Sequence, residues 1–476
     1  MRTSWRIVLV HTITFKQARQ WVPVVLAIGA VRGLSDGPWA VVALVGAVTA
    51  VSLVSAVLVW WRFRYSPGEA AVVVTRGLLS RSVRTVPLDR VRGVEVEAPL
   101  LHRALGLVRV RIDAAAGAVQ ADEEELVVDG LPPAEADRLR THLLARRAPD
   151  VPAEAFAADP PEEEFARLDD RWLLYAPLVG SYLAVPLAAV GALFRLVDEL
   201  PRRWRPDLDR PDLTDTAVVG LVLLAVAVLL VVGSIVGSAL VNWRFRLVRR
   251  GGSLVAVRGL LTRRHTELEV DRIRGCTVSE GLGMRWVRAA RATALVTGLG
   301  DAARRGQLLP LGPRAEAWAV TRRLVEDPGP LRAHPPAARR RRLVRAVAPG
   351  GVVLVVGVVL TAGLGLWWVL LTGAVLTALG VPLGLGRYAA LGHVAGARTF
   401  SVRSGWLVRE QAVLQRRAVV GWQVQQTFVQ RRQGLATVLA AVGAGAGGYQ
   451  ALDVAAEDAV PFAVAASGRW AETLAP

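Results

Sequence analysis

The sequence repeats one long unit, and this repeat decides what the chain can fold into. Each unit joins an uncharged apolar segment to a basic stretch with strand periodicity. The tetrapeptide Trp-Arg-Phe-Arg follows an apolar segment at 61–64 and again at 243–246. Two further motifs recur at the same spacing without a gap, Arg-Gly-Leu-Leu at 76–79 and 258–261, and Asp-Arg-x-Arg-Gly at 89–93 and 271–275. Self-similarity at a fixed offset indicates repeated structural units.

A third, more diverged copy follows the last apolar stretch. It keeps three glycines at one constant offset from the first copy but has Arg417 where the first copy has Asp89. The second copy keeps the Asp-Arg signature and has Arg288 in place of Gly106. The repeat positions that we expect to be structural are Gly77, Asp89, Gly93, Gly106, Gly259, Asp271, Gly275, Gly405, Gly421 and Gly434.

The composition is typical of a membrane protein. Of the 476 residues, 53% are hydrophobic, and the mean hydropathy of +0.38 is too high for an ordinary soluble protein of this size. The formal net charge of +18 fits nucleic acid or an anionic membrane surface, and the apolar segments favour the membrane. The single cysteine, Cys276, allows no intrachain disulfide, and we expect it to be a small buried apolar residue.

The apolar segments group into three pairs, which predicts three transmembrane hairpins. The segment 20–31 is short for a span, whereas 38–61 and 216–241 have full length, and 172–194 contains two prolines that could kink it. The uncharged stretch 346–386 is long enough for two spans. The predicted parts are a basic N-terminal segment (1–19), hairpin 1 (20–61), domain 1 (62–147), an acidic, proline-rich linker (148–171), hairpin 2 (172–243), domain 2 (244–326), a basic linker (327–345), hairpin 3 (346–386) and a diverged domain 3 (387–476).

The stretches between the hairpins have the pattern of small β-rich domains. Residues 91–97 and 107–112 alternate strictly, as strands with one buried face do. Residues 132–146 place apolar side chains on one helical face. We therefore predict several antiparallel strands closed by one C-terminal helix in each copy. The basic N-terminal segment could form an amphipathic helix at the membrane interface.

Basic residues follow the predicted spans directly at the start of each domain, as at Arg62, Arg244 and Arg387. By the positive-inside rule this places the N-terminus and all three domains in the cytoplasm. An even number of spans must then precede each domain, which supports the weak first span. The sequence predicts a multi-pass protein of the bacterial plasma membrane.

The paired spans, the Arg-Gly-Leu-Leu turn, the Leu-Asp-Arg-Val-Arg-Gly-Val-Glu-Val strand at 88–96 and the Arg-x-Leu-Gly-Leu segment at 103–107 together identify a family. The chain resembles the bacterial pleckstrin-homology-like (PH-like), membrane-flanked proteins of the YdbS/YdbT type, in a three-copy form. The resemblance implies a polytopic α-helical membrane protein with three α+β, β-rich PH-like split-barrel domains, each with a C-terminal helix. The molecular function of this family is not established, so the resemblance implies architecture rather than activity.

Arginines recur on the predicted strands and could contact anionic lipid headgroups or partner proteins. Alternatively, they are solvated residues that keep the domains soluble and cytoplasmic. The candidate contacts are Arg62, Arg64, Arg76, Arg90, Arg92, Arg103, Arg244, Arg246, Arg258, Arg272, Arg274, Arg285 and Arg431.

No recurring nucleophile, base or metal set supports catalysis, and we predict neither an enzyme nor a cofactor. Asp89 and Asp271 lack a recurring partner carboxylate or histidine, and a turn cap or local ion pair is expected there. The glycine-rich segment 443–448 lacks the Lys-Ser/Thr of a phosphate-binding loop, and we expect a flexible hairpin loop.

The favoured function is a non-enzymatic membrane protein whose domains bind partner proteins, each other or the anionic inner leaflet, with a possible role in envelope maintenance or stress tolerance. We expect other membrane proteins or further copies of the chain as partners, with anionic phospholipid headgroups as possible ligands, and no nucleic acid. The alternative is a transporter or channel component with the domains as gating or assembly modules. Few polar residues lie in the predicted spans, which favours the first function.

Overall fold

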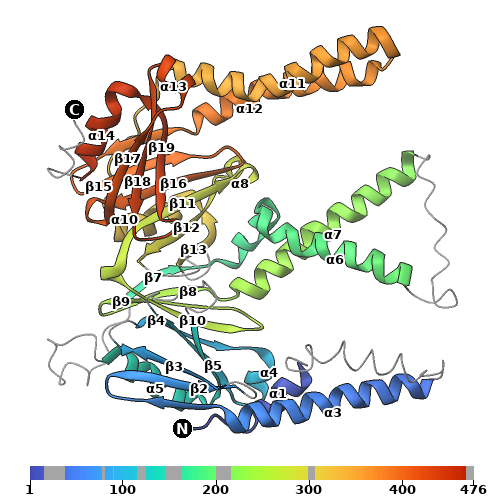
Figure 1. Ribbon diagram of the computed structural model, residues 1–476, viewed down its shortest axis with the longest axis vertical. Helices are drawn as coiled ribbons and strands as arrows, with labels where there is room; N and C mark the ends of the chain where they lie inside the picture. The colour runs from blue at the N-terminus through green and yellow to red at the C-terminus, as the bar shows by residue number, and fades with distance from the viewer. Residues whose placement is uncertain are drawn as a thin grey trace. The chain divides into compact units, whose positions relative to one another are not determined.

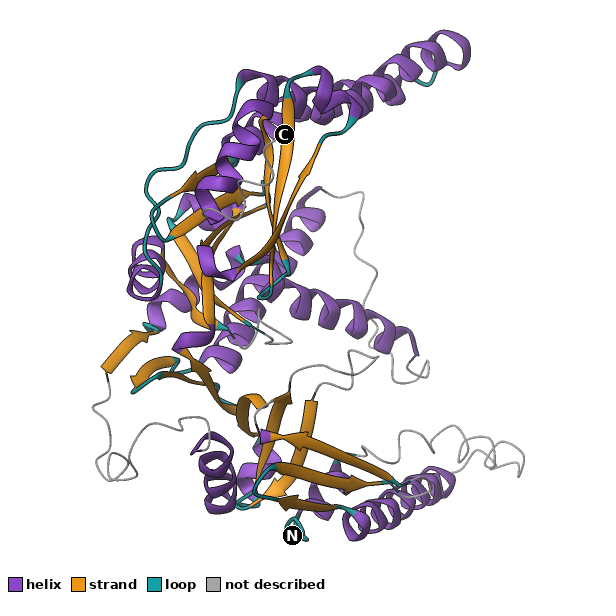
Figure 2. Cartoon of the chain, turned by 60° about the vertical axis from the view of Figure 1, so that its left-hand side comes forward, coloured by secondary structure: helices purple, strands orange, loops and turns teal. Residues whose placement is uncertain are grey.

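The computed structural model describes residues 1–14, 38–77, 81–88, 91–114, 125–145, 163–199, 216–297 and 306–467. The predicted first span at 20–31, with Asp89 and Arg90, lies outside these ranges. The described chain forms two compact units, which are residues 1–163 with 249–267 and residues 164–248 with 268–476 (Figure 1). In each unit the strands gather in one body, and helices lie along it or project from it (Figure 2).

The first unit contains the whole first copy and two strands of the second. The first copy has the predicted order of strands followed by a C-terminal helix. Its first three strands form a sheet in the order β1-β2-β3, and the other sheet runs β6-β5-β4-β10-β9 within this unit. The elements are α1 (Ile7–Ile13), α3 (Pro38–Arg62), β1 (Arg64–Pro67), β2 (Ala71–Arg76), β3 (Ser82–Pro87), β4 (Val91–Ala98), α4 (Leu100–Ala104), β5 (Val108–Ala114), β6 (Glu125–Leu131), α5 (Pro133–Ala145), β9 (Ser253–Arg258) and β10 (Arg263–Glu269).

The core of the first copy is formed by both of its sheets and by α5. On β5, Val110 and Ile112 are fully buried, as the alternation of the sequence predicts. Val72 on β2 and Leu143 on α5 belong to the same buried cluster. The domain is therefore held together by contacts between its N-terminal sheet, its C-terminal sheet and its last helix.

The second unit contains the rest of the second copy and the whole third copy. Its strands form a six-stranded sheet in the order β13-β12-β11-β16-β15-β14 and a three-stranded sheet β17-β18-β19. Its elements are β7 (Glu163–Arg167), η5 (Asp170–Leu178), α6 (Gly180–Glu199), α7 (Thr216–Asn242), η7 (Val270–Arg272), β11 (Ile273–Gly281), α8 (Leu282–Trp286), β12 (Ala289–Val296), β13 (Gln307–Pro313), α10 (Arg314–Leu324), α11 (Pro336–Leu364), α12 (Trp367–Ala389), β14 (Gly392–Ala395), β15 (Thr399–Ser404), β16 (Val408–Gln415), η8 (Arg416–Ala418), β17 (Val419–Gln425), α13 (Phe428–Arg432), β18 (Leu435–Val442), β19 (Gly448–Ala455) and α14 (Ala456–Ser467). Strand β8 (Arg246–Arg250) begins in this unit.

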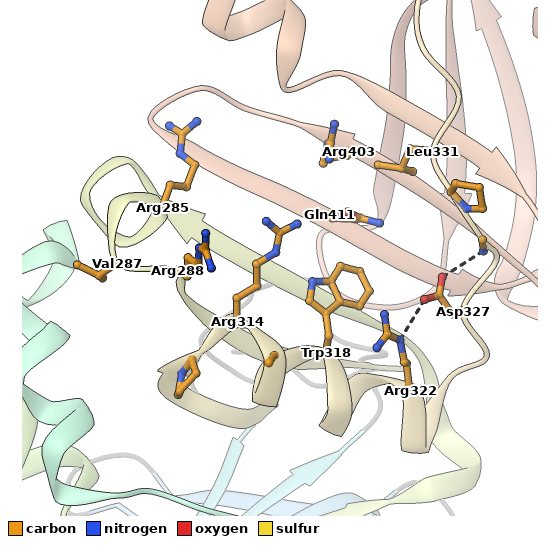
Figure 3. Close-up of a pocket in the computed structure, with 14 residues that line it drawn as sticks. Arg285, Val287, Arg288, Arg314, Trp318, Arg322, Asp327, Leu331, Arg403 and Gln411 are labelled. Carbon is orange, nitrogen blue, oxygen red and sulfur yellow. Dashed lines mark hydrogen bonds and ion pairs between the residues drawn. The ribbon is translucent and has the colours of Figure 1, made fainter.

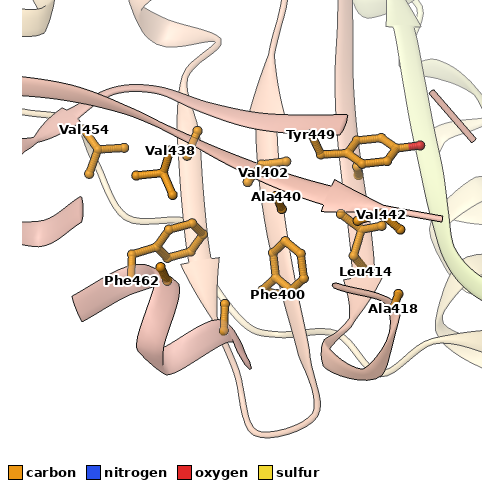
Figure 4. Packing of buried hydrophobic residues seen from close by; sticks show 14 of the residues in the cluster. Phe400, Val402, Leu414, Ala418, Val438, Ala440, Val442, Tyr449, Val454 and Phe462 are labelled. Atoms are coloured by element: carbon orange, nitrogen blue, oxygen red, sulfur yellow. The ribbon is translucent and has the colours of Figure 1, made fainter. Parts of the chain in front are cut away.

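The core of the third copy has the same construction. Phe400 on β15, Val438 on β18 and Phe462 on α14 point into one buried cluster (Figure 4). The Phe400 and Phe462 rings meet edge to face with their centroids 6.4 Å apart. Strands of both sheets and the last helix therefore close the domain, as in the first copy.

Consecutive copies are joined by strand pairing. In the first and third copies, the third and fourth strands belong to different sheets. The fourth strand of the first copy, β4, pairs instead with the third strand of the second copy, β10. In the same way β11 of the second copy pairs with β16 of the third copy. These two antiparallel pairings, which we call the first and second joints, extend each C-terminal sheet into the next copy.

Five of the repeat glycines occupy turns that need a left-handed backbone, whereas Gly93, Gly275 and Gly421 lie within strands. Gly77 and Gly405 end the second strand of their copies with φ of 116° and 92°. Gly106 and Gly434 precede the fifth strand with φ of 67° and 63°. Arg288, which replaces this glycine in the second copy, has φ of 52°, a conformation that costs a residue with a Cβ atom more than it costs glycine.

Three of the described helices are long and apolar enough to cross a membrane, namely α7, α11 and α12. The apolar part of α3 at 46–62 is a shorter candidate, and the side chains of α3 before it lie outside the description. Both helical pairs of the second unit, α6 with α7 and α11 with α12, project away from its strands (Figure 1). The six predicted spans are thus represented by three helices of full length and two incomplete candidates.

The predicted third span at 172–194 is broken. Residues 170–178 form η5, and α6 leaves it at an angle of 74°. Pro177 lies inside η5, where its missing N–H and fixed φ disfavour a continuous helix. Ala176 of η5 packs instead against Met284 and Leu311 of the second domain. The first half of this predicted span is therefore part of the domain surface.

The described part of the N-terminal segment packs on the first domain. Ile7 and Val10 on α1 are buried against Leu107. The Met1 amino group donates to the Tyr65 carbonyl at 2.6 Å. The helix is only seven residues long, and the domain covers Ile7, Val8 and Val10, whereas Leu9 and Ile13 remain exposed.

Candidate anion-binding site

The candidate arginines of the first copy that are described lie on the surface, three of them close together where α3 ends and β1 pairs with β2. Arg62 ends α3, Arg64 begins β1 and Arg76 ends β2, and all three are exposed. Arg103 on α4 donates to the Leu260 carbonyl at 2.8 Å and so helps to hold the first joint. The side chain of Arg92 lies outside the description.

The candidates of the second copy differ strongly in exposure. Arg244 is exposed and has φ of 50°, and Arg246 lies 3.8 Å from Glu164. Arg258 is only 5% exposed, so it presents no charge to a surface. The remaining two are half-buried: Arg272, whose Nε lies 2.6 Å from Glu269, and Arg274. The strand arginines of this copy therefore do not form one exposed basic face.

Five arginines converge instead on a pocket in the second unit, between elements of the second and third copies (Figure 3). The cavity has a volume of about 970 Å³. Of the predicted candidates only Arg285 lines it, while Arg431 is exposed elsewhere on α13. The lining residues are Arg285, Val287, Arg288, Pro313, Arg314, Ala315, Trp318, Arg322, Asp327, Gly329, Pro330, Leu331, Arg403 and Gln411.

Helix α10 supplies one wall of this pocket. Arg314, Trp318 and Arg322 are four residues apart, so they lie on one face of the helix (Figure 3). Arg285 comes from the end of α8, and Arg403 faces them from β15 of the third copy. The second joint fixes the distance between these walls because β11 and β16 belong to one sheet.

Positive charge dominates the pocket. The one acidic residue among its described lining residues, Asp327, forms an ion pair with Nε of Arg322 at 3.1 Å. The nearby Glu280 forms an ion pair with Nε of Arg314 at 2.9 Å. Burial lowers the pKa of Arg403, and the neighbouring charges of Arg409 and Arg314 lower it further. Burial and Arg409 also lower the pKa of Arg285. Mutual repulsion of this kind is relieved when an anion binds.

The pocket lies close to the domain end of α12, an apolar helix that could cross a membrane. Arg403 donates to the carbonyls of Ala389, Ala390 and Leu391, where α12 ends, at 3.2–3.5 Å. Arg285 donates to the carbonyl of Trp406. An anion at this position would be bound near the point where the third hairpin leaves the domain.

Sequence reasoning missed most of this pocket. The four-residue spacing of Arg314, Trp318 and Arg322 on a predicted helix was a possible signal. Arg403 could not have been assigned, since only the pairing of β11 with β16 brings the third copy to the second.

Sequence reasoning also missed two aspartates that attach helices to domains. In the third copy, Asp453 accepts hydrogen bonds from Arg341 and from Arg342, the latter at 2.7 Å, and both arginines lie near the start of α11. Asp453 is fully buried and also accepts from Gln430 at 2.9 Å. Asp129 has the corresponding role in the first copy.

Asp129 lies 2.7 Å from Nε2 of His102 and 3.3 Å from Nε2 of His11 on α1. Arg109 donates to the same carboxylate at 2.9 Å. Burial would raise the pKa of Asp129, but these three partners outweigh it and hold the pKa well below its ordinary value. Asp129 and its three partners therefore attach α1 to β6.

Within the described ranges, no group of three or more His, Cys, Asp or Glu side chains could hold a metal ion. Cys276 is fully buried on β11, and burial raises the pKa of its thiol to about 12. The glycine-rich segment joins β18 to β19, as predicted for a hairpin connection.

Comparison with known proteins gives one family and one curated relative. The model of a family described as "Bacterial PH domain" matches residues 21–147, 191–325 and 350–463. The chain is 24% identical over 246 residues to the UPF0699 transmembrane protein YdbT of Bacillus subtilis (strain 168). This alignment covers 48% of each chain, so the sequence spans about half the length of that relative. No solved structure gives a significant match.

Proposed function

Because the chain belongs to the bacterial PH domain family, with three matches along its length, we propose a non-enzymatic role in which its domains bind anionic groups at the membrane surface. The observation that carries this proposal is the pocket between the second and third copies. Five arginines line it and its single carboxylate is already paired. Arginine binds phosphate oxygens through two parallel hydrogen bonds, which suits a phospholipid headgroup.

The location of the pocket supports a lipid ligand. Arg403 contacts the carbonyl groups at the end of α12, where a headgroup would lie if this helix spans the bilayer. Trp318 adds an aromatic surface beside the charges, as is common at membrane interfaces. A multi-pass topology with the domains in the cytoplasm agrees with the arginines that follow the apolar helices, and the family's transmembrane relative YdbT points to the same location.

The packing of the third hairpin speaks against a transport path between its helices. Gly350 on α11 lies so close to α12 that a Cβ atom there would meet the Thr377 backbone nitrogen at 2.5 Å. Gly357 makes the same kind of approach to the backbone of Leu370. Small residues at such positions let helix backbones pack directly on each other. The two helices are therefore packed too closely to leave a path between them, which fits a role as a membrane anchor.

Lipid binding is tested on the full-length protein in detergent by native mass spectrometry with equal amounts of phosphatidylglycerol and phosphatidylcholine. We expect the wild type to retain phosphatidylglycerol preferentially. The double variant Arg288→Ala/Arg314→Ala should lose this preference, because it removes two pocket charges. The matched control Arg64→Ala/Arg76→Ala removes two exposed charges from the first copy and should keep it. Equal retention of both lipids by the wild type, or equal loss in both double variants, would contradict the proposal.

Topology is tested by labelling single cysteines in intact cells, since the native Cys276 is buried. Ser66→Cys, at an exposed position of β1, should react only after the inner membrane is permeabilised. Leu364→Cys, at the exposed turn between α11 and α12, should react without permeabilisation. The reverse pattern would place the domains outside the cytoplasm.

A further inference from the structure

The two joints between copies use the same register. In the first joint, Glu95 on β4 is opposite Thr266 on β10. In the second joint, Thr277 on β11 is opposite Ala412 on β16. Thr277 is the repeat equivalent of Glu95, while Thr266 and Ala412 are the repeat equivalents of Arg84 in the second and third copies. One geometry therefore connects copy 1 to copy 2 and copy 2 to copy 3.

Among the described residues, this serial arrangement leaves one strand of each kind, β3 and β17, paired along one edge only. β3 is the third strand of the first copy and lies at the edge of the sheet β1-β2-β3. β17 is the fourth strand of the third copy and lies at the edge of the sheet β17-β18-β19. In both joints a fourth strand pairs with a third strand. Within the described strands, the first copy therefore has an unpaired edge on its third strand, and the third copy has an unpaired edge on its fourth strand.

β17 lacks the usual protection of a sheet edge. Its seven residues contain no charged residue and no proline, although natural edge strands are commonly blunted by one or the other. Val420 is 76% exposed, and Gln423, Val424 and Gln425 are also exposed. An uncharged edge with exposed valines fits strand addition by another chain.

Gly421 on β17 leaves room for a further strand beside β17. Its equivalent in the second joint, Gly275, has the Val413 carbonyl oxygen of the neighbouring copy 2.5 Å from where a Cβ would lie. Glycine is thus needed there for the close approach of β16. Among the described residues, apart from its own chain neighbours, no atom lies within 4 Å of the corresponding position of Gly421. A third-type strand docked in the register of the joints would approach Gly421 as β16 approaches Gly275.

We propose that β17 of one chain pairs antiparallel with β3 of a second copy of this chain, in the register of the two joints. This register places Gln423 opposite Arg84, and Val424 opposite Val83. The side-chain carbonyl oxygen of Gln423 can accept a hydrogen bond from Arg84 directly opposite, while Gln425, the repeat equivalent of Glu97, lies opposite Ser82. The interface is heterologous, so chains add head to tail in a ring or an open row.

The register is tested by disulfide cross-linking in native membranes. Two differently tagged full-length chains are co-expressed, one carrying Val83→Cys and the other Val424→Cys. Mild oxidation should give a heterodimer that carries both tags. The matched control replaces Val424→Cys by Val420→Cys, which is more exposed but is shifted four positions along the strand, about 13 Å. It should give little heterodimer.

Three results would overturn the proposal. They are the absence of a heterodimer, equal yields for the two cysteine positions, and a cross-linked product whose mass shows a different protein. If one chain carrying both Val83→Cys and Val424→Cys closes only on itself, the pairing is internal and the proposal is also wrong.

A second variant separates assembly from folding. Gly421→Val adds a side chain where the isolated chain has free space, so the thermal midpoint in detergent should stay at the wild-type value. In the proposed pair the valine would meet the backbone of β3, and the cross-linked fraction should be lost. Persistence of the heterodimer in this variant would contradict the docking geometry, as would an equal effect on folding and assembly.

Discussion

The Nε atom of Arg264 lies 3.3 Å from the carboxylate of Glu97, although the two residues belong to different copies of the domain. Arg111, from the same copy as Glu97, also approaches that carboxylate at 3.3 Å. The Glu97 side chain is 3% exposed, so the first joint contains a buried negative charge that is compensated from both sides. Strand pairing and charge pairing therefore fix the same register.

Replacement of Glu97 by glutamine should destabilise the first unit by about 2 kcal/mol, because it leaves the half-buried Arg111 and Arg264 without their buried counter-charge. Chemical denaturation of the detergent-purified chain measures this loss. The control is Glu164→Gln, which removes an exposed partner of Arg246 and should cost less than about 1 kcal/mol. A similar small effect for both variants would show that the buried pair contributes little.

The variant Gly275→Ala should weaken the second joint. A Cβ atom at this position meets the Val413 carbonyl oxygen at 2.5 Å and the Leu414 Cα atom at 3.1 Å, so the strands must separate. Overpacking of this kind costs about 1–3 kcal/mol. Hydrogen exchange of the β11 and β16 amides should become faster than in wild type. Unchanged exchange would mean that the backbone absorbs the methyl group.

The variant Arg288→Gly should stabilise the second unit by about 1 kcal/mol, since glycine adopts a φ of 52° without the Cβ penalty. The reciprocal variant Gly434→Arg, at the equivalent turn of the third copy, should lose a similar amount, because nothing else crowds that position. Thermal midpoints of the two variants should move in opposite directions. Movement in the same direction would exclude backbone strain as the cause.

Acid should destabilise the second unit through His334. Burial and, to a smaller extent, the nearby His393 together lower the pKa of this histidine from 6.5 to about 4. Below pH 6.5 the histidine is protonated in the unfolded chain but stays neutral in the folded chain. The free energy of unfolding therefore decreases as the pH falls from about 6.5 to 4. At pH 5 the contribution is about 2 kcal/mol. The variant His334→Gln should flatten the stability profile between pH 7 and 5, and an unchanged slope would refute this origin.

Local patterns in the sequence predicted the elements well. The alternation around Val110 and Ile112 identified β5 and its buried face, and the glycine at 77 identified a turn. The third predicted span is bent by 74° after η5, and apolar residues of η5 pack on the second domain, an environment as apolar as lipid. Hydrophobicity alone does not distinguish these two apolar environments.

Contacts between copies could not be predicted from the sequence. Each strand carries the same period whether its neighbour belongs to its own copy or to the next one. The pocket depends on such a contact, since Arg403 reaches α10 only through the second joint. The burial of Arg258 could not be predicted from the sequence either, because an arginine on an alternating strand is expected at an exposed position. The sequence therefore predicted the domains better than the candidate site between two of them.

Helix α11 runs without interruption from its contact with the third domain into the apolar hairpin. It begins at Pro336, well before the predicted span at 346, and Arg341 and Arg342 fasten it to Asp453. Pro349 lies inside this helix at the start of its apolar part, where its missing N–H removes one helical hydrogen bond and allows a bend. Bilayers of different thickness change the tilt of a spanning helix. If α11 crosses the bilayer, a change in tilt can be absorbed by bending at Pro349, while Arg341 and Arg342 keep the segment before it fastened to the third domain, which would insulate the arginine pocket from the thickness of the surrounding lipid.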